Sequence, residues 1–282
     1  MENRICICGA GTMGSGIAQI AAASGIHTLL FDLSQSALEK AKKSIGESLD
    51  RRVSKKRITE EEKIRIVDRL AYSKHPGDCL SGFIIEAVVE KPEAKIALFN
   101  QLAEINHSET VFATNTSSLS VTHIAGRIKN PERVIGMHFF NPAPVMKLVE
   151  VVTTELTNPS TIEKTMQLAR QLGKIPVVCR DAPGFIVNRV ARPYYIESLR
   201  MVEEGVAGIA TVDRLLEATG FKMGPFRLMD LIGNDVNYAV SCSVYDQLGQ
   251  PERLKPSRLQ KEKVDTGLLG KKTGQGYYTY NP

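Results

Sequence analysis

Short apolar runs alternate with longer mixed segments through the first two thirds of the chain. Five of these runs have the length and β-branched content of buried strands: FIIEAVV, TVFATN, RVIGMHF, KLVEVV and IPVVC. Two more, RICIC and HTLLFD, precede them. Strands that alternate with helical or loop segments are typical of α/β folds. The pattern therefore predicts a doubly wound, mostly parallel sheet.

The alternation ends at residues 180–185, RDAPGF, where Pro183 and Gly184 interrupt it. Beyond this point apolar residues recur every three or four positions, as in amphipathic helices. The segments are FIVNRVARPYYIESLRMVEEG, TVDRLLEATG and PFRLMDLIGNDVNYAVSCSVYDQLG. A chain of 282 residues is long enough for two domains. We predict an α/β domain over residues 1–182 and an all-α C-terminal domain over residues 183–282.

A glycine-rich turn follows the first predicted strand. Gly9, Gly11 and Gly14 match G-x-G-x-x-G: the first permits a tight turn, the second a close approach to a diphosphate, and the third close helix packing. The following helix N-terminus favours anionic groups. Asp32 ends the next strand, where a carboxylate binds ribose hydroxyls and repels a 2′-phosphate. This order predicts a Rossmann-like NAD site, including Thr12 and Met13, rather than a purely structural turn.

The segment GMHFFNPAPVMKLVE, residues 136–150, predicts an acid/base pair. Pro142 and Pro144 separate two strand-like runs, so we expect the chain to fold back near Pro144. His138 and Glu150 are equidistant from that point and would face each other across two paired strands. Glu150 would orient His138 and stabilise its protonated form, so that the imidazole exchanges a proton with a substrate hydroxyl. The alternative is a purely structural hydrogen bond.

Cysteine usage and the N-terminus bear on location. The five cysteines, odd in number and without metal-ligand spacing, are Cys6, Cys8, Cys79, Cys179 and Cys242. Cys6 and Cys8 point to one face of a strand, as small core residues do. The segment MENRICICG has charges where a signal peptide needs an apolar stretch, and no apolar run approaches membrane-spanning length. We predict a cytoplasmic protein with no metal and no membrane partner.

The net charge of +5 is partly concentrated in RRVSKKR, residues 51–57, on a predicted helix. A short basic run usually marks a solvated helix end. It can also bind an anionic substrate handle such as a phosphorylated nucleotide tail. The run lacks interleaved aromatic residues and belongs to no nucleic-acid-reading module, so we predict no nucleic-acid partner.

Six segments occur in the order of a known family: GAGTMGSGIAQ, NTSSLS, GMHFFNPAPVMKLVEVV, DAPGFIVNR, GPFRLMDLIGNDV and GKKTGQGYYTY. Over essentially its whole length the chain resembles the short, single-function 3-hydroxyacyl-CoA dehydrogenases, and most of all the bacterial 3-hydroxybutyryl-CoA dehydrogenases. The resemblance implies an NAD-dependent oxidoreductase that interconverts (S)-3-hydroxyacyl-CoA and 3-oxoacyl-CoA. It also supports a homodimer formed through the C-terminal domain.

The resemblance also implies roles for individual residues. His138 matches the catalytic base and Glu150 its partner, while Ser117 matches the serine that hydrogen-bonds the substrate's 3-oxygen. Asn188 matches an asparagine that helps to hold the substrate. For Ser117 the alternative is a helix N-cap, and Ser118 could cap the helix in its place.

Further matches concern the cofactor and the CoA tail. Asn115 and Asn141 match asparagines close to the nicotinamide, and Glu90 and Lys95 match residues near the cofactor ribose. Lys55 and Lys56 approximately match basic positions that meet the 3′-phosphate of coenzyme A. Two other functions stay open from the residues alone: an NAD-dependent dehydrogenase of a free hydroxy acid or sugar acid, and a non-catalytic NAD-binding protein.

Overall fold

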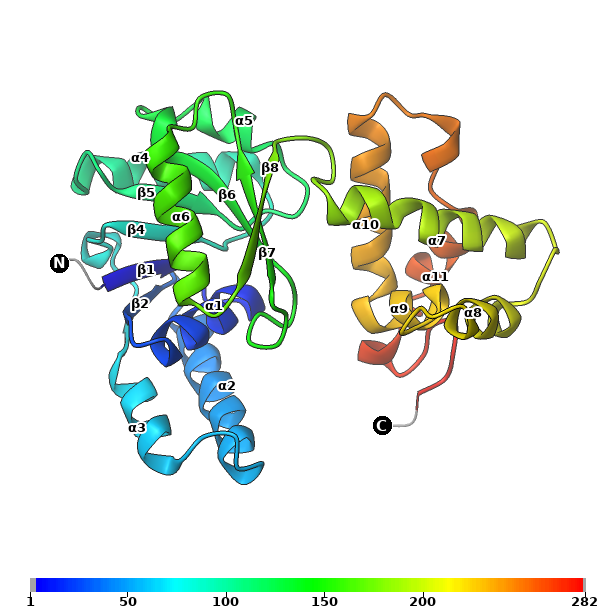
Figure 1. Ribbon diagram of the computed structural model, residues 1–282, viewed down its shortest axis with the longest axis horizontal. Coiled ribbons are helices and arrows are strands. Elements are labelled where there is room, and N and C mark those ends of the chain that lie inside the picture. The colour runs from blue at the N-terminus through cyan, green and yellow to red at the C-terminus, as the bar shows by residue number, and fades with distance from the viewer. Residues whose placement is uncertain (1–3, 281–282) are drawn as a thin grey trace. The chain divides into compact units, whose positions relative to one another are not determined.

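The computed structural model of the protein describes residues 4–280 (Figure 1). Residues 1–3, which belong to the segment that argues against a signal peptide, and residues 281–282 lie outside the described part. The chain divides into two compact units, the first ending at Asp181 and the second beginning at Ala182. The predicted boundary lies one residue further along.

The first unit is built on one eight-stranded sheet. Its strands are β1 (Arg4–Cys8), β2 (His27–Phe31), β3 (Leu70–Ser73), β4 (Phe83–Glu86), β5 (Val111–Thr114), β6 (Val134–Phe139), β7 (Leu148–Thr153) and β8 (Ile175–Arg180). Its α-helices are α1 (Thr12–Ala23), α2 (Gln35–Ser54), α3 (Glu60–Asp68), α4 (Pro92–Ile105), α5 (Val121–Ala125) and α6 (Pro159–Gln171).

The strand order is β3-β2-β1-β4-β5-β6-β7-β8. All neighbouring strands are parallel except β6 and β7, which pair antiparallel because the chain folds back between them. The predicted doubly wound, mostly parallel sheet is confirmed. The edge strand β3 has only four residues and none of them is buried, so the apolar pattern did not reveal it.

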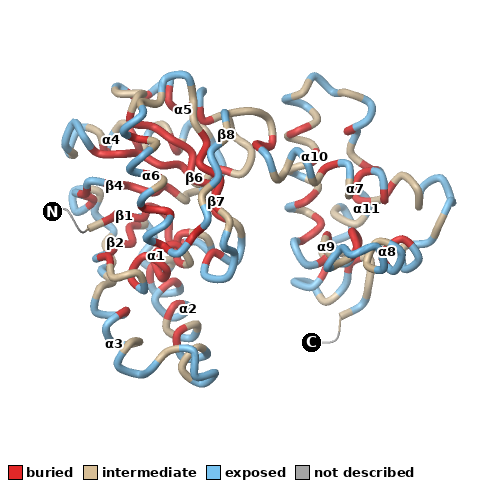
Figure 2. Tube along the Cα trace, viewed as in Figure 1, coloured by how far each residue is buried: buried red, intermediate tan, exposed pale blue. Residues whose placement is uncertain are grey.

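Side chains alternate between the two faces of the sheet, and each face has its own helices. On one face Ile7, Ile85 and Met137 form a core with residues of α1, α2 and α6. On the other, Cys8 and Ile84 pack with residues of α4 and α5. Figure 2 shows the resulting buried layer along the strands. Residues at even positions of β4 and β6 therefore face the α4/α5 side.

The second unit is helical, as predicted. Its α-helices are α7 (Val187–Glu203), α8 (Ile209–Ala218), α9 (Pro225–Ile232), α10 (Asn234–Gln247) and α11 (Arg258–Asp265). The apolar segment predicted around residues 225–249 is two helices, because Gly233 has a φ of 104° and interrupts the helical path. The core residues are Tyr195, Leu199, Val212, Phe226 and Met229.

Within residues 4–280, no helix combines the length and the apolar content that crossing a lipid bilayer requires.

Candidate active site

His138 and Glu150 face each other across β6 and β7. They are register partners in the antiparallel pair, and His138 Nδ1 lies 2.7 Å from Glu150 Oε2. Both side chains are buried, with 6% and 1% of each residue exposed. The predicted fold-back and pairing are thus confirmed. The His138 ring also packs against Phe140, with centroids 4.5 Å apart.

This arrangement fixes which imidazole nitrogen can do chemistry. A carboxylate accepts hydrogen bonds only, so His138 Nδ1–H donates a hydrogen bond to Glu150. Proton exchange with a substrate would therefore use His138 Nε2. The buried carboxylate holds the ring in one tautomer and one orientation, as a general base requires.

The glycine turn fits a diphosphate. Gly9 has a φ of 106°, and a Cβ on Gly14 would lie 1.7 Å from Gly9 O, so both positions need glycine. Nothing lies within 4 Å of a Cβ placed on Gly11, which leaves room for a ligand. Gly11 is the N-cap of α1 and offers no side-chain acceptor to the first turn, where Thr12 and Met13 lie. These backbone N–H groups are oriented to bind an anion.

Asp32 is held beside this turn. Its Oδ2 accepts a hydrogen bond of 2.8 Å from the backbone N–H of Ala10, and its Oδ1 accepts one of 2.9 Å from Ser34 N–H. The carboxylate follows β2 directly and is half-buried. Its position suits the predicted contact with ribose hydroxyls, which stays a prediction.

The segment after β5 carries the predicted polar residues. Asn115 Oδ1 accepts a hydrogen bond from Phe139 N–H at 2.9 Å, which ties this segment to the end of β6. Ser117 follows it and is half-buried. The N-cap of α5 is Ser120, whose hydroxyl accepts from His123 N–H. The alternative in which Ser117 or Ser118 caps the helix is therefore wrong, because α5 begins later than the apolar pattern indicates.

A buried ionic network lies at the carboxyl ends of β4 and β5. Lys95 Nζ is 2.7 Å from Glu86 Oε1 and 3.1 Å from Glu90 Oε2, and the side chains of Lys95 and Glu86 are both fully buried. Thr114 and Val88 also donate to Glu86. Sequence analysis missed Glu86, although an acid that ends the apolar strand FIIE is a signal for a buried partner.

The two carboxylates of this network experience different surroundings. Burial raises the pKa of Glu86, although the charge of Lys95 opposes it. The pKa of Glu90 is lowered overall. Burial by itself would raise this pKa, but the charge of Lys95 and hydrogen bonds from Thr116 and Ser117 outweigh the effect of burial. The Glu90 side chain is 37% exposed and ionised at neutral pH, so it can contact a ligand while bound to Lys95.

A cavity of about 450 Å³ lies between α1, α2 and the loop after β6. Gln19 lines it, and its buried Nε2 has no hydrogen-bond partner within the described residues. Lys40 and Arg51 supply positive charge, and Ser44 and Ser48 supply hydroxyls. An unpaired buried donor and two cations suit an anionic, polar ligand.

The loop after β6, which lines one side of this cavity, is held by a lysine side chain from another part of the unit. Lys174 Nζ donates to the carbonyl oxygens of Ala143 and Met146, at 2.5 and 2.7 Å. Burial lowers the pKa of Lys174. Asn141, predicted to lie near the nicotinamide, is exposed in this loop and lines the cavity beside Gly11.

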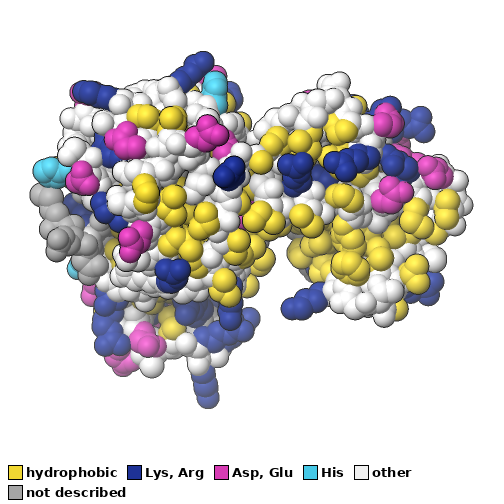
Figure 3. Space-filling view, turned by 45° about the horizontal axis from the view of Figure 1, so that its top comes forward, with side chains coloured by type: hydrophobic (Ala, Val, Ile, Leu, Met, Phe, Trp, Pro, Cys, Tyr) yellow, Lys and Arg dark blue, Asp and Glu magenta, His cyan; other side chains and the backbone are white. Residues whose placement is uncertain are grey.

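The basic run is only partly helical, contrary to expectation. Helix α2 ends at Ser54, Lys55 is its C-cap, and Lys56 has a left-handed φ of 53°. Both Lys55 and Lys56 are exposed to solvent, and neither lines the cavity. Lys55 follows Arg51 by four positions, so the two lie on the same side of the helix end. Figure 3 shows basic side chains gathered around the ends of α2 and α3.

Asn188 belongs to the second unit. It is the second residue of α7, so it lies in the first turn of that helix. Its carbonyl oxygen accepts a hydrogen bond of 2.9 Å from Nε of Arg192, which is buried. Its predicted role in substrate binding stays a prediction.

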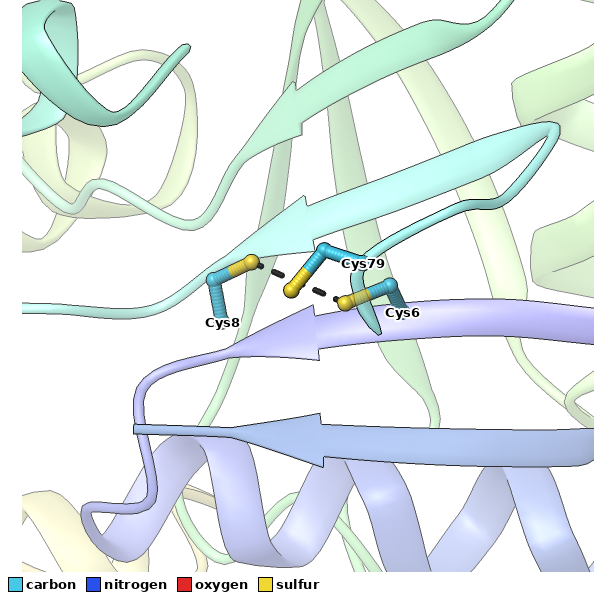
Figure 4. A group of neighbouring side chains, drawn as sticks. All are labelled: Cys6, Cys8 and Cys79. Carbon is cyan, nitrogen blue, oxygen red and sulfur yellow. Dashed lines mark hydrogen bonds between the residues drawn. The ribbon is translucent and has the colours of Figure 1, made fainter. Parts of the chain in front are cut away.

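Three of the cysteines form a cluster that the sequence did not predict. Cys79, from the segment before β4, joins Cys6 and Cys8 of β1, and the three sulfurs lie within 4.8 Å of one another (Figure 4). All are fully buried. Hydrogen bonding to Cys79 and burial raise the pKa of Cys6, and hydrogen bonding to Cys6 and burial raise that of Cys8. The bonds from Cys6 and Cys8 lower the pKa of Cys79 to about 5.

This cluster is a poor metal site on physical grounds. The pKa values of Cys6 and Cys8 are raised, so a metal would have to displace their protons in order to bind. The surrounding side chains, which include Leu29 and Phe31, are apolar and would not stabilise further negative charge. Small sulfur-containing side chains that fill a core explain the cluster, and the absence of a metal stays a prediction.

Comparison with known proteins is consistent with this geometry. Residues 4–182 match the family described as 3-hydroxyacyl-CoA dehydrogenase, NAD binding domain. Residues 184–280 match the description 3-hydroxyacyl-CoA dehydrogenase, C-terminal domain. The two matches together cover nearly all of the chain.

Individual relatives agree. The 3-hydroxyadipyl-CoA dehydrogenase of Escherichia coli is 49% identical over 98% of this chain, which spans only 58% of that longer protein. The mitochondrial hydroxyacyl-coenzyme A dehydrogenase of Sus scrofa is 39% identical over 99% of this chain and 92% of its own. The crystal structure of (S)-3-hydroxybutyryl-CoA dehydrogenase from Ralstonia eutropha covers both chains completely, with a TM-score of 0.95 at 36% identity. The chain therefore belongs to the 3-hydroxyacyl-CoA dehydrogenase family.

Proposed function

We propose that this protein interconverts (S)-3-hydroxyacyl-CoA and 3-oxoacyl-CoA with NAD, and that 3-hydroxybutyryl-CoA and acetoacetyl-CoA are its substrates. The observation that carries the proposal is the buried His138–Glu150 pair, with Nδ1 and Oε2 2.7 Å apart, in a domain that also has the dinucleotide turn. Members of the same family whose names specify hydroxyacyl-CoA substrates support the choice of substrate.

Several residues of the first unit would hold the cofactor. The N–H groups after Gly11 would bind the diphosphate, and Asp32 would accept hydrogen bonds from the adenosine ribose. Glu90 and Asn115 would lie near the nicotinamide end. When bound, NAD supplies the group that accepts or donates hydride at carbon 3 of the substrate.

The chain's own residues would manage the proton. In oxidation, His138 Nε2 takes the hydroxyl proton while Glu150 stabilises the imidazolium; in reduction, the imidazolium returns the proton to the 3-oxygen. Ser117 would hydrogen-bond that oxygen, and Asn188 would help to hold the substrate. Correct positioning of this kind lowers the barrier by several kcal/mol.

The cavity between α1 and α2 is the place we propose for the CoA tail. Lys40 and Arg51 line it, and Lys55 lies one helical turn beyond Arg51. Phosphates of the tail would pair with these cations, while Gln19 Nε2 would donate to a polar group of the pantetheine arm. A free hydroxy acid has no CoA tail and would therefore not bind in this cavity.

The test is a comparison of NADH oxidation with acetoacetyl-CoA, 3-oxoadipyl-CoA and free acetoacetate. We expect the two thioesters to be reduced and the free acid to react poorly. His138→Ala should bind NADH nearly as well as the wild type but lower kcat by about 100-fold or more. Equal rates with free acetoacetate, or full activity of His138→Ala, would refute the proposal.

Two further predictions accompany the proposal. The apolar helical faces of the second unit predict a homodimer, and the reduced cysteines predict a cytoplasmic protein. Size-exclusion chromatography with light scattering would test the first, and cell fractionation the second.

A further inference from the structure

Glu90 connects the buried ionic network to the segment that carries Ser117. Its Oε1 accepts hydrogen bonds from the Thr116 hydroxyl at 2.5 Å and from the backbone N–H of Ser117 at 3.0 Å. Its Oε2 pairs with Lys95. The position of the Ser117 main chain therefore depends on a carboxylate that is itself held by a buried ammonium group.

Thr116 extends this restraint along the chain. Its hydroxyl oxygen accepts from Leu119 N–H at 2.9 Å and from Ser118 N–H at 3.3 Å, while the hydroxyl donates to Glu90. Thr116 is 1% exposed. One buried hydroxyl thus ties the turn after Ser117 to Glu90, because it accepts from the Ser118 and Leu119 N–H groups and donates to that carboxylate.

Glu86 is the anchor of the network. Its two oxygens accept from Lys95, Thr114 and Val88 at 2.7 Å each, all inside the protein. Glu86 and Thr114 are register partners in neighbouring strands of the central sheet, so the sheet fixes the contact between them, while Lys95 reaches Glu86 from α4. The sequence of contacts runs from the sheet through Glu86, Lys95 and Glu90 to Ser117.

The network lies on the same face of the sheet as the acid/base pair, and Glu86, Thr114 and His138 lie at or near the C-terminal ends of β4, β5 and β6. Glu86 is the register partner of Thr114, and Thr114 that of Gly136. His138 follows Gly136 by two residues on β6, so its side chain is on the same face. The sheet therefore sets both the position of the base and, through the network, that of the serine.

We propose that Glu86, Lys95 and Thr116 are positioning residues that fix Ser117 for the 3-oxygen of the substrate. This inference rests on the function proposed above. It assigns Lys95 a different role from direct contact with the cofactor ribose, because Lys95 is completely buried between two carboxylates. Lys95 acts through Glu90, and Glu90 acts through the main chain of Ser117.

The first test uses Thr116→Val, which keeps the side-chain shape but removes the hydroxyl, and Thr116→Ser, which restores it. Misplacing a substrate-binding group by about 1 Å can cost about 100-fold in rate. We expect Thr116→Val to lower kcat with acetoacetyl-CoA by about 10- to 100-fold, with an unchanged Kd for NADH by fluorescence titration. Thr116→Ser should recover most of the rate.

A double-mutant cycle tests whether the network acts through Ser117. We expect Glu86→Gln to lower kcat in the wild-type background but to have little further effect in the Ser117→Ala background, because the positioned group is then absent. Arg133→Met is a control: it removes a different buried charge of this unit, just before the first residue of β6, and should lower stability without changing kcat.

Hydrogen exchange of the peptide covering residues 115–120 gives a readout without catalysis. Exchange should accelerate in Glu86→Gln and Thr116→Val but not in Arg133→Met. Three results would overturn the inference while leaving the proposed function intact. They are an unchanged exchange rate of this peptide in both variants, additive losses of kcat in the double-mutant cycle, and a loss of NADH affinity without a loss of kcat. A wild-type protein that is inactive on thioesters but shows the exchange pattern would overturn the function and leave the restraint on Ser117 standing.

Discussion

At the scale of single residues, the site depends on polar groups that are buried together with their partners. His138 and Glu150 are both nearly inaccessible, and burying either alone would be costly. The hydrogen bond between them gives each buried polar group a partner and fixes the tautomer of the imidazole. The geometry needed for proton transfer is thus also the geometry that makes burial tolerable.

Replacing the carboxylate by its amide tests this dependence. Glu150→Gln keeps the shape and one acceptor but removes the charge that stabilises the imidazolium. We expect kcat for acetoacetyl-CoA reduction to fall by about 100-fold. The Kd for NADH should stay close to the wild-type value, because Glu150 lies in the sheet and not at the glycine turn. Wild-type kcat in this variant would show that the pair is only structural.

At the scale of elements, the turn between β1 and α1 depends on the lack of a side chain at one position. A Cβ on Gly14 would lie 1.7 Å from Gly9 O, so Gly14→Ala must push the helix away from the turn. We expect this variant to lose NADH affinity by at least about tenfold and to melt at a lower temperature than the wild type.

Gly46 offers a matched control for that change. It lies within α2 with nothing within 4 Å of an added Cβ, so Gly46→Ala should raise stability by up to about 1 kcal/mol and leave NADH binding unchanged. Fluorescence titration with NADH and a thermal melt of both variants are the measurements. Equal NADH affinities for the two variants would contradict the role of the turn.

The end of α2 carries the second prediction at this scale. The double variant Arg51→Ala/Lys55→Ala removes two cations from one side of the helix and should raise KM for acetoacetyl-CoA by about tenfold or more, without changing the Kd for NADH. Lys43→Ala removes one cation from the same helix, at a position that does not line the cavity, and should change neither value. An equal rise in both constants would show that the cavity serves the cofactor.

At the scale of the whole molecule, each unit has its own core and its own polar anchors. In the second unit Asp230 is fully buried and holds the C-terminal segment. Its oxygens accept from Asn234 Nδ2, the backbone N–H groups of Tyr277 and Tyr278, and the Tyr280 hydroxyl, at 2.9 to 3.0 Å. The last described residues are therefore part of the fold of this unit.

Removing this anchor should destabilise the protein without affecting the cofactor site. Asp230→Asn turns one acceptor into a donor that faces other donors, which should cost on the order of 3 kcal/mol in the free energy of unfolding. NADH affinity of the folded protein should not change, since the glycine turn belongs to the other unit. Asp246→Asn, at an exposed position, should change the unfolding free energy by less than about 0.5 kcal/mol in urea titration.

The sequence by itself determined the features that depend on residues close together in the chain. Apolar periodicity predicted the helical second unit and every strand except β3, and the spacing of Gly9, Gly11 and Gly14 predicted the turn, because backbone sterics act locally. The prolines between His138 and Glu150 even predicted their pairing, since a fold-back between two strands sets the register.

Only the tertiary structure decided which distant residues share a site. Cys79 joins Cys6 and Cys8 because the segment before β4 packs beside β1, and Glu86 joins Thr114 because β4 and β5 are neighbours in the sheet. Ser120 rather than Ser118 caps α5, since packing decides where that helix begins. Contacts between segments far apart in the chain depend on how whole elements pack, and no local pattern specifies that.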